Sequence, residues 1–303
     1  MFRRADVWFG SGGERCAAWL YLPTVATGTS PCVVMAHGTT GTRDLGLAAY
    51  AERFAGAGCA VVVFDYRHFG ASEGMPRQLV SIRHQLEDWR AAIRFARTVP
   101  EVDPDRIAIW GTSLGGGHVV TVAAADSTIA AAVAQLPWMG IDRRADSPRS
   151  ARVTRKLFGA ALWDAVRGML GRPPVMLRMV AAPGDIAVFT GAEDHAAMRA
   201  LAAGAPEWRN EMAGRSMLSL LRYRPGAAAG RVVVPLLICV ADDDTAASVP
   251  LAVRAANEAP HAELRRYPGS HFAAYTGDVF EQMVRDQTAF LQRHLAIKSL
   301  STE

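Results

Sequence analysis

A serine set between glycines, where a strand passes into a helix, is the sequence feature that most constrains this chain. Residues 111–115 read Gly-Thr-Ser-Leu-Gly, and they follow a compact apolar run, 106–110, that predicts a buried strand. The small apolar stretch 119–125 predicts a helix. In so tight a turn, a side chain at either flanking glycine would collide with neighbouring backbone. The pattern is that of a nucleophile elbow, and it predicts that the hydroxyl of Ser113 is held clear of a sheet at a helix N-terminus.

Apolar runs alternate with helical patterns along most of the chain. Besides 106–110, seven segments predict strands: 3–9, 15–22, 32–36, 59–64, 129–136, 235–241 and 262–267. Three longer segments with helical spacing are 45–56, 80–98 and 279–295. The middle strands are apolar throughout, which is typical of a parallel sheet with helices on both faces. We therefore expect an α/β fold.

Residues 138–230 interrupt this alternation and predict several helices with turns at prolines. Insertions of this kind in parallel α/β folds lie over the carboxyl ends of the strands, where ligands bind. We expect a core made of 1–137 and 231–303, with 138–230 as a helical cap; a packing or oligomerisation element is the alternative. Its large apolar residues are expected to form the core of the cap rather than a ligand surface: Phe158, Trp163, Met169, Met176, Met179 and Phe189.

A serine hydroxyl is a poor nucleophile at neutral pH, so it needs a base and an acid that orients this base. His271 is the candidate base, because it follows the last predicted strand on a loop at the carboxyl edge of the sheet. Three aspartates, 242–244, follow the preceding strand. We favour Asp244, which lies in the turn rather than at the strand tip, and Asp142 remains a further alternative.

The developing oxyanion needs amide donors. The elbow supplies the backbone N–H of Leu114, and the loop after an early strand, 35–41, should supply the second donor, for which we choose the N–H of Thr39. Trp138 follows the strand predicted at 129–136, close to where the elbow should open. It is either a wall of the substrate pocket or a packing residue.

The chain order Ser113, Asp244, His271 is that of the α/β-hydrolase triad. The sequence resembles this superfamily over essentially the whole chain apart from the cap. More narrowly, it is similar to bacterial esterase-like hydrolases of the dienelactone hydrolase and acetyl xylan esterase type. The matching pieces are 37–41, 64–72, the elbow, the aspartate turn and 269–272.

This resemblance implies a mostly parallel eight-stranded sheet whose second strand is antiparallel, and attack on a carbonyl carbon, usually of an ester. It implies that 65–72 shapes the core, with Tyr66 as a pocket-lining residue. The sequence departs from the family pattern at two positions. Ser248 stands where similar proteins often carry proline, which leaves open which aspartate is the acid, and Ala273 stands where they often carry an acidic residue.

These residues favour a serine hydrolase that cleaves a carboxylic ester or lactone of a small molecule through an acyl-enzyme. The same three side chains also serve carbon–carbon or amide bond hydrolysis, or acyl transfer to an acceptor other than water. A ligand-binding protein that keeps the fold without turnover is the third hypothesis. The sequence does not specify the oligomeric state, and a homodimer is compatible with it.

Other classes are disfavoured. The net charge of +4 comes from scattered arginines, so we expect no nucleic-acid partner, and without an apolar run of about 18 residues we expect no membrane span. The amino terminus lacks the apolar run of a secretory signal, and the 4 cysteines match no zinc or redox spacing. We therefore expect a cytoplasmic protein with reduced thiols. Phosphate-loop and metal-ligand motifs are missing from the sequence, so no cofactor and no metal are expected.

Overall fold

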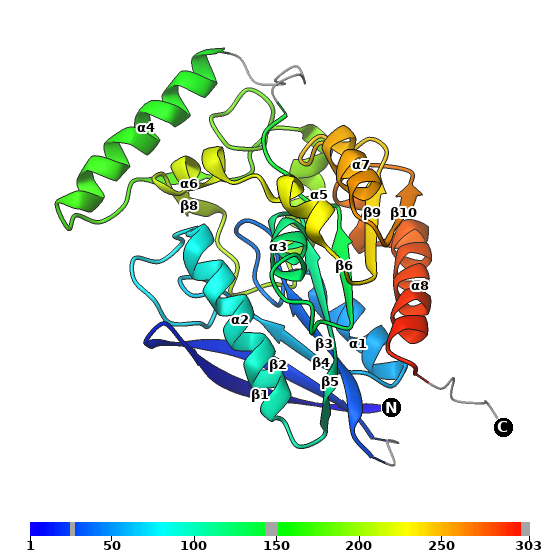
Figure 1. Ribbon diagram of the computed structural model, residues 1–303. Coiled ribbons are helices and arrows are strands. Elements are labelled where there is room, and N and C mark those ends of the chain that lie inside the picture. Colours follow the sequence, from blue (N-terminus) through cyan, green and yellow to red (C-terminus); the bar gives the residue numbers. More distant parts are fainter. Residues whose placement is uncertain (25–27, 143–150, 298–303) are drawn as a thin grey trace.

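A twisted sheet of eight strands forms the centre of the molecule. The computed structural model describes residues 1–24, 28–142 and 151–297. In spatial order the strands are β1 (Phe2–Ser11), β2 (Glu14–Pro23), β4 (Ala60–Phe64), β3 (Ser30–Ala36), β5 (Val102–Thr112), β6 (Ala131–Gln135), β9 (Leu236–Ala241) and β10 (Ala262–Tyr267) (Figure 1). Strand β2 is antiparallel to β1 and β4, and the other pairs are parallel. The predicted fold class is confirmed, including all eight strands and the antiparallel second strand.

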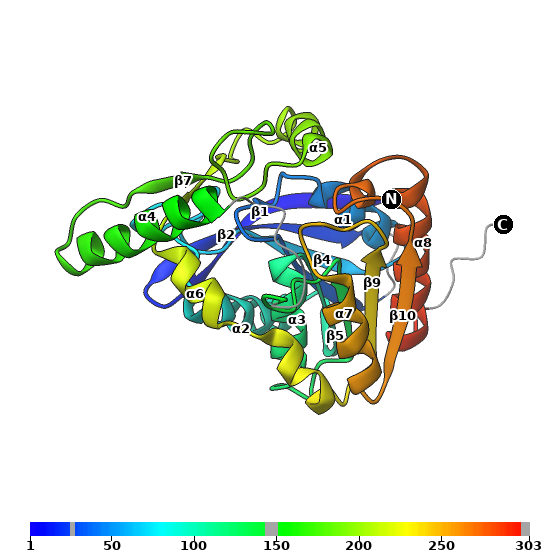
Figure 2. The same ribbon diagram turned by 90° about the horizontal axis from the view of Figure 1, so that it is seen from above.

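Alternating side chains of the central strands build one core on each face of the sheet. In β3, Cys32 and Val34 are buried on one face, and Val33 and Met35 on the other. The first face is covered by α2 (Ile82–Thr98), α3 (Leu114–Ala123) and α7 (Val249–Glu258). The second is covered by α1 (Leu47–Gly56) and α8 (Gly277–His294), as the view from above shows (Figure 2). Burial on both faces explains why strands such as β3 and β4 are apolar at nearly every position.

Ser248, at the position where the family pattern has proline, caps helix α7. Its Oγ accepts a hydrogen bond from the backbone N–H of Leu251 at 3.4 Å, which satisfies one of the amides left free at a helix start. The same hydroxyl donates to Oδ2 of Asp142 at 2.8 Å. With serine instead of proline at position 248, α7 therefore still has a well-defined start beside the aspartate turn.

The segment between β6 and β9 contains several short elements. They are α4 (Ala151–Met169), β7 (Met176–Arg178), α5 (Ala192–Ala202), β8 (Glu211–Ala213), α6 (Ser216–Arg222) and the 3-10 helix η1 (Pro225–Arg231). Strands β7 and β8 form an antiparallel pair, and α4 extends away from the sheet at the upper left of Figure 1. A backbone hydrogen bond of 2.8 Å from the N–H of Ala213 to the carbonyl of Gln78 joins the segment to the loop before α2.

The expectation that the large apolar residues of this segment form its own core was wrong for four of them. Phe158, Trp163, Met169 and Met176 are exposed, with Met169 80% accessible. Helix α4 instead buries Leu157, Ala161 and Asp164 on its opposite face. Within the described residues, no helix is both long enough and apolar enough to span a membrane.

Candidate active site

Ser113 lies on a strained turn between β5 and α3. Its backbone has φ 55° and ψ −120°, a conformation that residues other than glycine rarely adopt. A Cβ on Gly111 would lie 2.3 Å from the carbonyl oxygen of Gly115, and a Cβ on Gly115 would lie 2.5 Å from that of His37. Both distances are far below van der Waals contact, so the close approach of backbone requires glycine on either side of the serine, as the sequence pattern predicts.

The structure brings His271 and Asp244 together from different loops. The imidazole Nδ1 of His271 lies 2.6 Å from Oδ2 of Asp244, and both side chains are almost fully buried. The other carboxylate oxygen of Asp244 accepts the backbone N–H groups of Ala246 and Ala247, each at 2.8 Å. Three hydrogen bonds therefore fix this carboxylate, and they orient the histidine ring through Nδ1.

The neighbouring aspartates have other partners. Asp242 forms an exposed ion pair with Arg266 at 2.7 Å, and the backbone N–H of Asp243 donates to the carbonyl of Gly269 at 3.0 Å. The carboxylate of Asp142 accepts the hydroxyl of Ser248. The contact with His271 thus favours Asp244 over each alternative considered from the sequence.

The loop after β3 passes directly against the serine. A Cβ on Gly38 would lie 2.9 Å from the Cβ of Ser113, so the backbone approaches the nucleophile closely there. His37 donates from Nδ1 to the carbonyl of Gly38 at 2.9 Å, and burial lowers the pKa of His37 to about 4, which keeps this ring neutral. Thr39 lines the same cavity as Ser113, and the N–H of Leu114, at the first position of α3, has no acceptor inside the helix.

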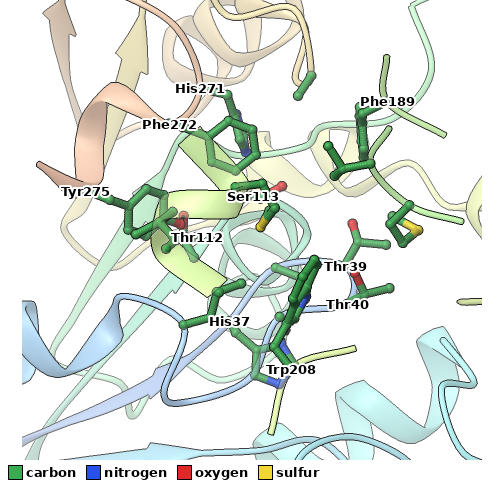
Figure 3. Close-up of a pocket in the computed structure, with 18 of the residues that line it drawn as sticks. His37, Thr39, Thr40, Thr112, Ser113, Phe189, Trp208, His271, Phe272 and Tyr275 are labelled. Atoms are coloured by element: carbon green, nitrogen blue, oxygen red, sulfur yellow. Dashed lines mark hydrogen bonds between the residues drawn. The ribbon is translucent and has the colours of Figure 1, made fainter. Parts of the chain in front are cut away.

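Ser113 and His271 both line a cavity of about 70 Å³ (Figure 3). In this view His271 and Phe272 lie above the serine, Tyr275 lies to its left, and Thr39, Thr40 and Trp208 lie below it. The remaining wall is mostly apolar and comes from both the core and the segment between β6 and β9. It consists of Leu45, Leu47, Met179, Val180, Phe189, Met198, Leu201 and Ala246, together with small and polar groups of the 37–41 loop.

Two residues expected to contact substrate lie elsewhere. Tyr66 is fully buried behind His37, where its hydroxyl accepts the indole N–H of Trp89 at 2.9 Å, so it does not line the cavity. The ring of Trp138 stacks on Tyr223 rather than facing the cavity, while its backbone N–H donates to the carbonyl of Ser113 at 2.9 Å. Both positions follow from contacts with residues of other elements on the same face of the sheet, which strand order alone does not reveal.

The sequence patterns missed most of the cavity wall. Phe272 and Tyr275 follow His271 directly, and Met198, Leu201 and Trp208 come from the inserted segment. A scan of the residues just after His271 could have found the first two. The others carry no signal, because their position depends on how the insertion folds back over the sheet. Met179 and Phe189, expected in a cap core, also line the cavity.

A buried histidine holds the elbow helix to its neighbours. His118 in α3 is inaccessible, and its ring nitrogens lie 2.9 Å from the Tyr223 hydroxyl and 2.9 Å from Oε1 of Gln85. Burial, together with a smaller contribution from His37, lowers the pKa of His118 to about 3. The neutral ring can satisfy both partners, whereas an imidazolium would be buried without a counter-charge.

Stability should therefore fall in mild acid partly because of His118. Its pKa in the folded state lies below the value of about 6.5 in the unfolded chain, so the unfolded chain binds more protons between these values and stability decreases as pH falls. From pH 7 to pH 5 this one group should cost about 2 kcal/mol. Urea unfolding at both pH values should show a smaller pH-dependent loss for His118→Gln than for the wild type. An equal loss in both proteins would contradict the assignment.

Among the described residues, no group of three or more His, Cys, Asp or Glu side chains is placed to hold a metal ion. All four cysteines belong to the described residues and are free and buried. The polar groups around Ser113 are thus an imidazole, a carboxylate, hydroxyls and backbone amides, which is the set that acyl chemistry at a serine uses.

Comparison with known proteins agrees with this geometry. Residues 29–271 match the family model described as serine aminopeptidase, S33. The chain belongs to this α/β-hydrolase family. The superfamily expected from the elbow and its partners is thereby confirmed, and the S33 assignment places the chain more specifically within it.

Relatives of this S33 hydrolase cover nearly its whole length. The quorum-quenching protein AidA of Acinetobacter baumannii is 43% identical over 97% of this chain and 96% of its own. The polyketide transferase af380 of Aspergillus fumigatus is 26% identical over 96% of this chain and 99% of its own. Among solved structures, the α/β hydrolase GrgF of Penicillium sp. superimposes with a TM-score of 0.82 at 26% identity, covering 97% and 99% of the two chains.

Proposed function

We propose that this protein is a serine hydrolase that cleaves a carboxylic ester or lactone through an acyl-enzyme intermediate. The observation that carries the proposal is that Ser113 and His271 line one cavity while Asp244 holds the far nitrogen of the imidazole at 2.6 Å. The three groups supply the nucleophile, the base and the orienting acid that acyl transfer requires.

In this mechanism Ser113 attacks the carbonyl carbon while Nε2 of His271 accepts the hydroxyl proton. The carboxylate of Asp244 keeps the proton on Nδ1 and stabilises the imidazolium as it forms. The N–H groups of Leu114 and Thr39 are the proposed donors to the oxyanion, because one begins α3 and the other lies on the loop that passes against Ser113. His271 then returns the proton to the leaving group, and water, deprotonated by the same imidazole, releases the acyl group.

The substrate should be small and partly apolar. The cavity combines the polar elbow with methionine, leucine and aromatic side chains, and segment 138–230, which we propose acts as a cap, contributes much of this apolar wall. Because the 43% identical relative is named a quorum-quenching protein, we extend the proposal to a quorum-sensing signal that carries an ester or lactone bond. The narrower resemblance to dienelactone hydrolases and acetyl xylan esterases points to the same bond class.

A fluorophosphonate probe tests the proposal most directly. We expect the probe to label Ser113 stoichiometrically, identified by peptide mass spectrometry, and to abolish hydrolysis of p-nitrophenyl esters. Labelling should fail in His271→Ala, in which the hydroxyl has lost its base. Absence of labelling in the wild-type protein, with esters and lactones also left intact, would contradict a hydrolase and favour a ligand-binding protein.

The cap side chains should set acyl-chain preference. Leu201→Ala removes three carbons from the cavity wall, and each buried methylene of substrate is worth about 0.8 kcal/mol, so preference should move toward longer acyl chains by about 10-fold or more in kcat/KM. The measurement is a series of p-nitrophenyl esters from acetate to decanoate. Leu170→Ala is the matched control, because Leu170 belongs to the same segment and is 70% exposed. An identical chain-length profile in all three proteins would exclude this wall as the acyl site.

Acyl transfer is the second candidate, favoured by the relative named a polyketide transferase. An apolar cavity that limits water could pass the acyl group to an alcohol or amine instead. Product analysis by mass spectrometry in the presence of added alcohols and amines separates the two. A transferase should give mainly the new ester or amide, whereas a hydrolase should give mainly the free acid.

A further inference from the structure

A chain of buried hydrogen bonds runs from the sheet core to the histidine loop. The indole N–H of Trp110 donates to Oε1 of Gln287 at 2.9 Å, and Nε2 of Gln287 donates to Oε1 of Gln135 at 2.9 Å. Nε2 of Gln135 in turn donates to Oγ1 of Thr112 at 3.4 Å, and Thr112 shares a hydrogen bond of 3.0 Å with the hydroxyl of Tyr275. Gln135 and Gln287 are completely inaccessible, so these polar side chains have been removed from water and satisfied by one another.

The last bond of this chain joins the two loops that must meet at the reacting centre. Thr112 is the residue before Ser113, and Tyr275 ends the 3-10 turn η2 (Ala273–Tyr275), which follows His271. Figure 3 shows Tyr275 and Thr112 together beside Ser113. This bond links a side chain of η2 directly to a side chain of the elbow.

Tyr275 is itself held firmly. The backbone of its neighbour Ala274 accepts the hydroxyl of Tyr50 at 2.5 Å, and a Cβ on Gly46 would lie 2.7 Å from Cδ1 of the Tyr275 ring. Burial raises the pKa of Tyr275 to about 12, so its hydroxyl stays neutral and available as donor or acceptor. Packing fixes the ring of Tyr275, and its hydroxyl therefore restrains the position of Thr112 through the hydrogen bond between them.

We propose that Tyr275 is a positioning residue: its hydrogen bond to Thr112 holds the His271 loop in register with Ser113. The inference rests on the proposed hydrolase function. The hydrogen bond between Tyr275 and Thr112 should affect kcat, because a general base must stay within hydrogen-bond reach of the hydroxyl that it deprotonates. Small displacements of the base lower the turnover rate. The chain of donors that ends at Thr112 polarises this bond.

Tyr275→Phe is the first test. It keeps the ring and removes the hydroxyl, so kcat for p-nitrophenyl esters should fall about 10-fold while KM stays within about 3-fold, and the rate of fluorophosphonate labelling of Ser113 should fall in parallel. Tyr21→Phe is the matched control: Tyr21 is also fully buried, but it lies on β2 and does not line the cavity. We expect wild-type kinetics for the control.

Thr112 variants test the same bond from its other end. Thr112→Val should reproduce the kcat loss of Tyr275→Phe, Thr112→Ser should restore most of it, and the double variant Thr112→Val with Tyr275→Phe should be no slower than the worse single variant. Losses that multiply in the double variant would overturn the proposal, as would wild-type kcat in Tyr275→Phe. Thermal unfolding of each variant shows whether enough folded protein is present for the comparison.

Ser113→Ala distinguishes failure of the inference from failure of the function. If Ser113→Ala is inactive and Tyr275→Phe is unimpaired, only the positioning role is wrong. If Ser113→Ala retains full activity, the hydrolase mechanism itself is wrong, and the role of Tyr275 falls with it.

Discussion

Replacement of Ser113 by alanine should lower kcat for ester substrates by about 10⁴–10⁶-fold, the loss typical of a nucleophile that acts as a unit with its base. The alanine fits the turn as well as the serine does, because the flanking glycines and the backbone at residue 113 are unchanged. The folded state should therefore persist, and the loss should lie in the chemical step. Steady-state hydrolysis of p-nitrophenyl butanoate, with circular dichroism of the same samples, measures both.

Ser219→Ala is the control for this prediction, since Ser219 lies on α6 and does not line the cavity. Its kcat should equal that of the wild type. Substantial ester turnover by Ser113→Ala, after removal of contaminating esterases by a second purification, would show that another group makes the attack.

Asp244→Asn should have the second largest effect, a loss of about 10³–10⁴-fold in kcat. The carboxylate accepts from His271 with one oxygen and from two backbone amides with the other. An asparagine has only one oxygen, and if the two amides retain it, the NH₂ group faces Nδ1. The imidazole then places its proton on Nε2 and can no longer accept the proton of Ser113.

The neighbouring aspartates provide matched controls. Asp243→Asn and Asp242→Asn should retain near wild-type kcat, and the second loses only an exposed ion pair with Arg266, worth about 1 kcal/mol or less. An active Asp244→Asn together with an inactive Asp142→Asn would reassign the acid to Asp142. Equal activity in all four variants would show that the histidine works without a carboxylate.

Most of the sheet could be predicted from the chain because its strands are short and locally patterned. The central runs 32–36 and 59–64 are apolar at every position, since side chains on both faces are covered by helices. The elbow was equally predictable. Gly111 is required by a contact within the turn itself, the 2.3 Å approach of its Cβ position to the Gly115 carbonyl, whereas Gly115 is required by the His37 carbonyl of the loop after β3.

The cavity wall could be predicted only in part. Ser113, His271 and Thr39 follow strands that end at the same edge, so the direction of the strands brings them together. Tyr66 also follows such a strand, yet it packs behind His37 and bonds to Trp89 instead of facing the cavity. The end of a strand predicts which residues lie near the site. The direction in which each side chain points depends on its partners from other elements.

The sequence alone determined the order of strands along the chain, the strained serine turn and the residue types available for catalysis, because each depends on local periodicity or on close backbone contacts. Only the tertiary structure decided which of the neighbouring aspartates binds His271, how residues 151–230 contribute to the cavity, and that Tyr275 meets Thr112. These outcomes depend on hydrogen bonds and packing between separate segments, which lie 27 residues apart for Asp244 and His271 and 163 residues apart for Thr112 and Tyr275. A buried polar group must find a partner somewhere in the fold, but nothing in its immediate sequence specifies which one.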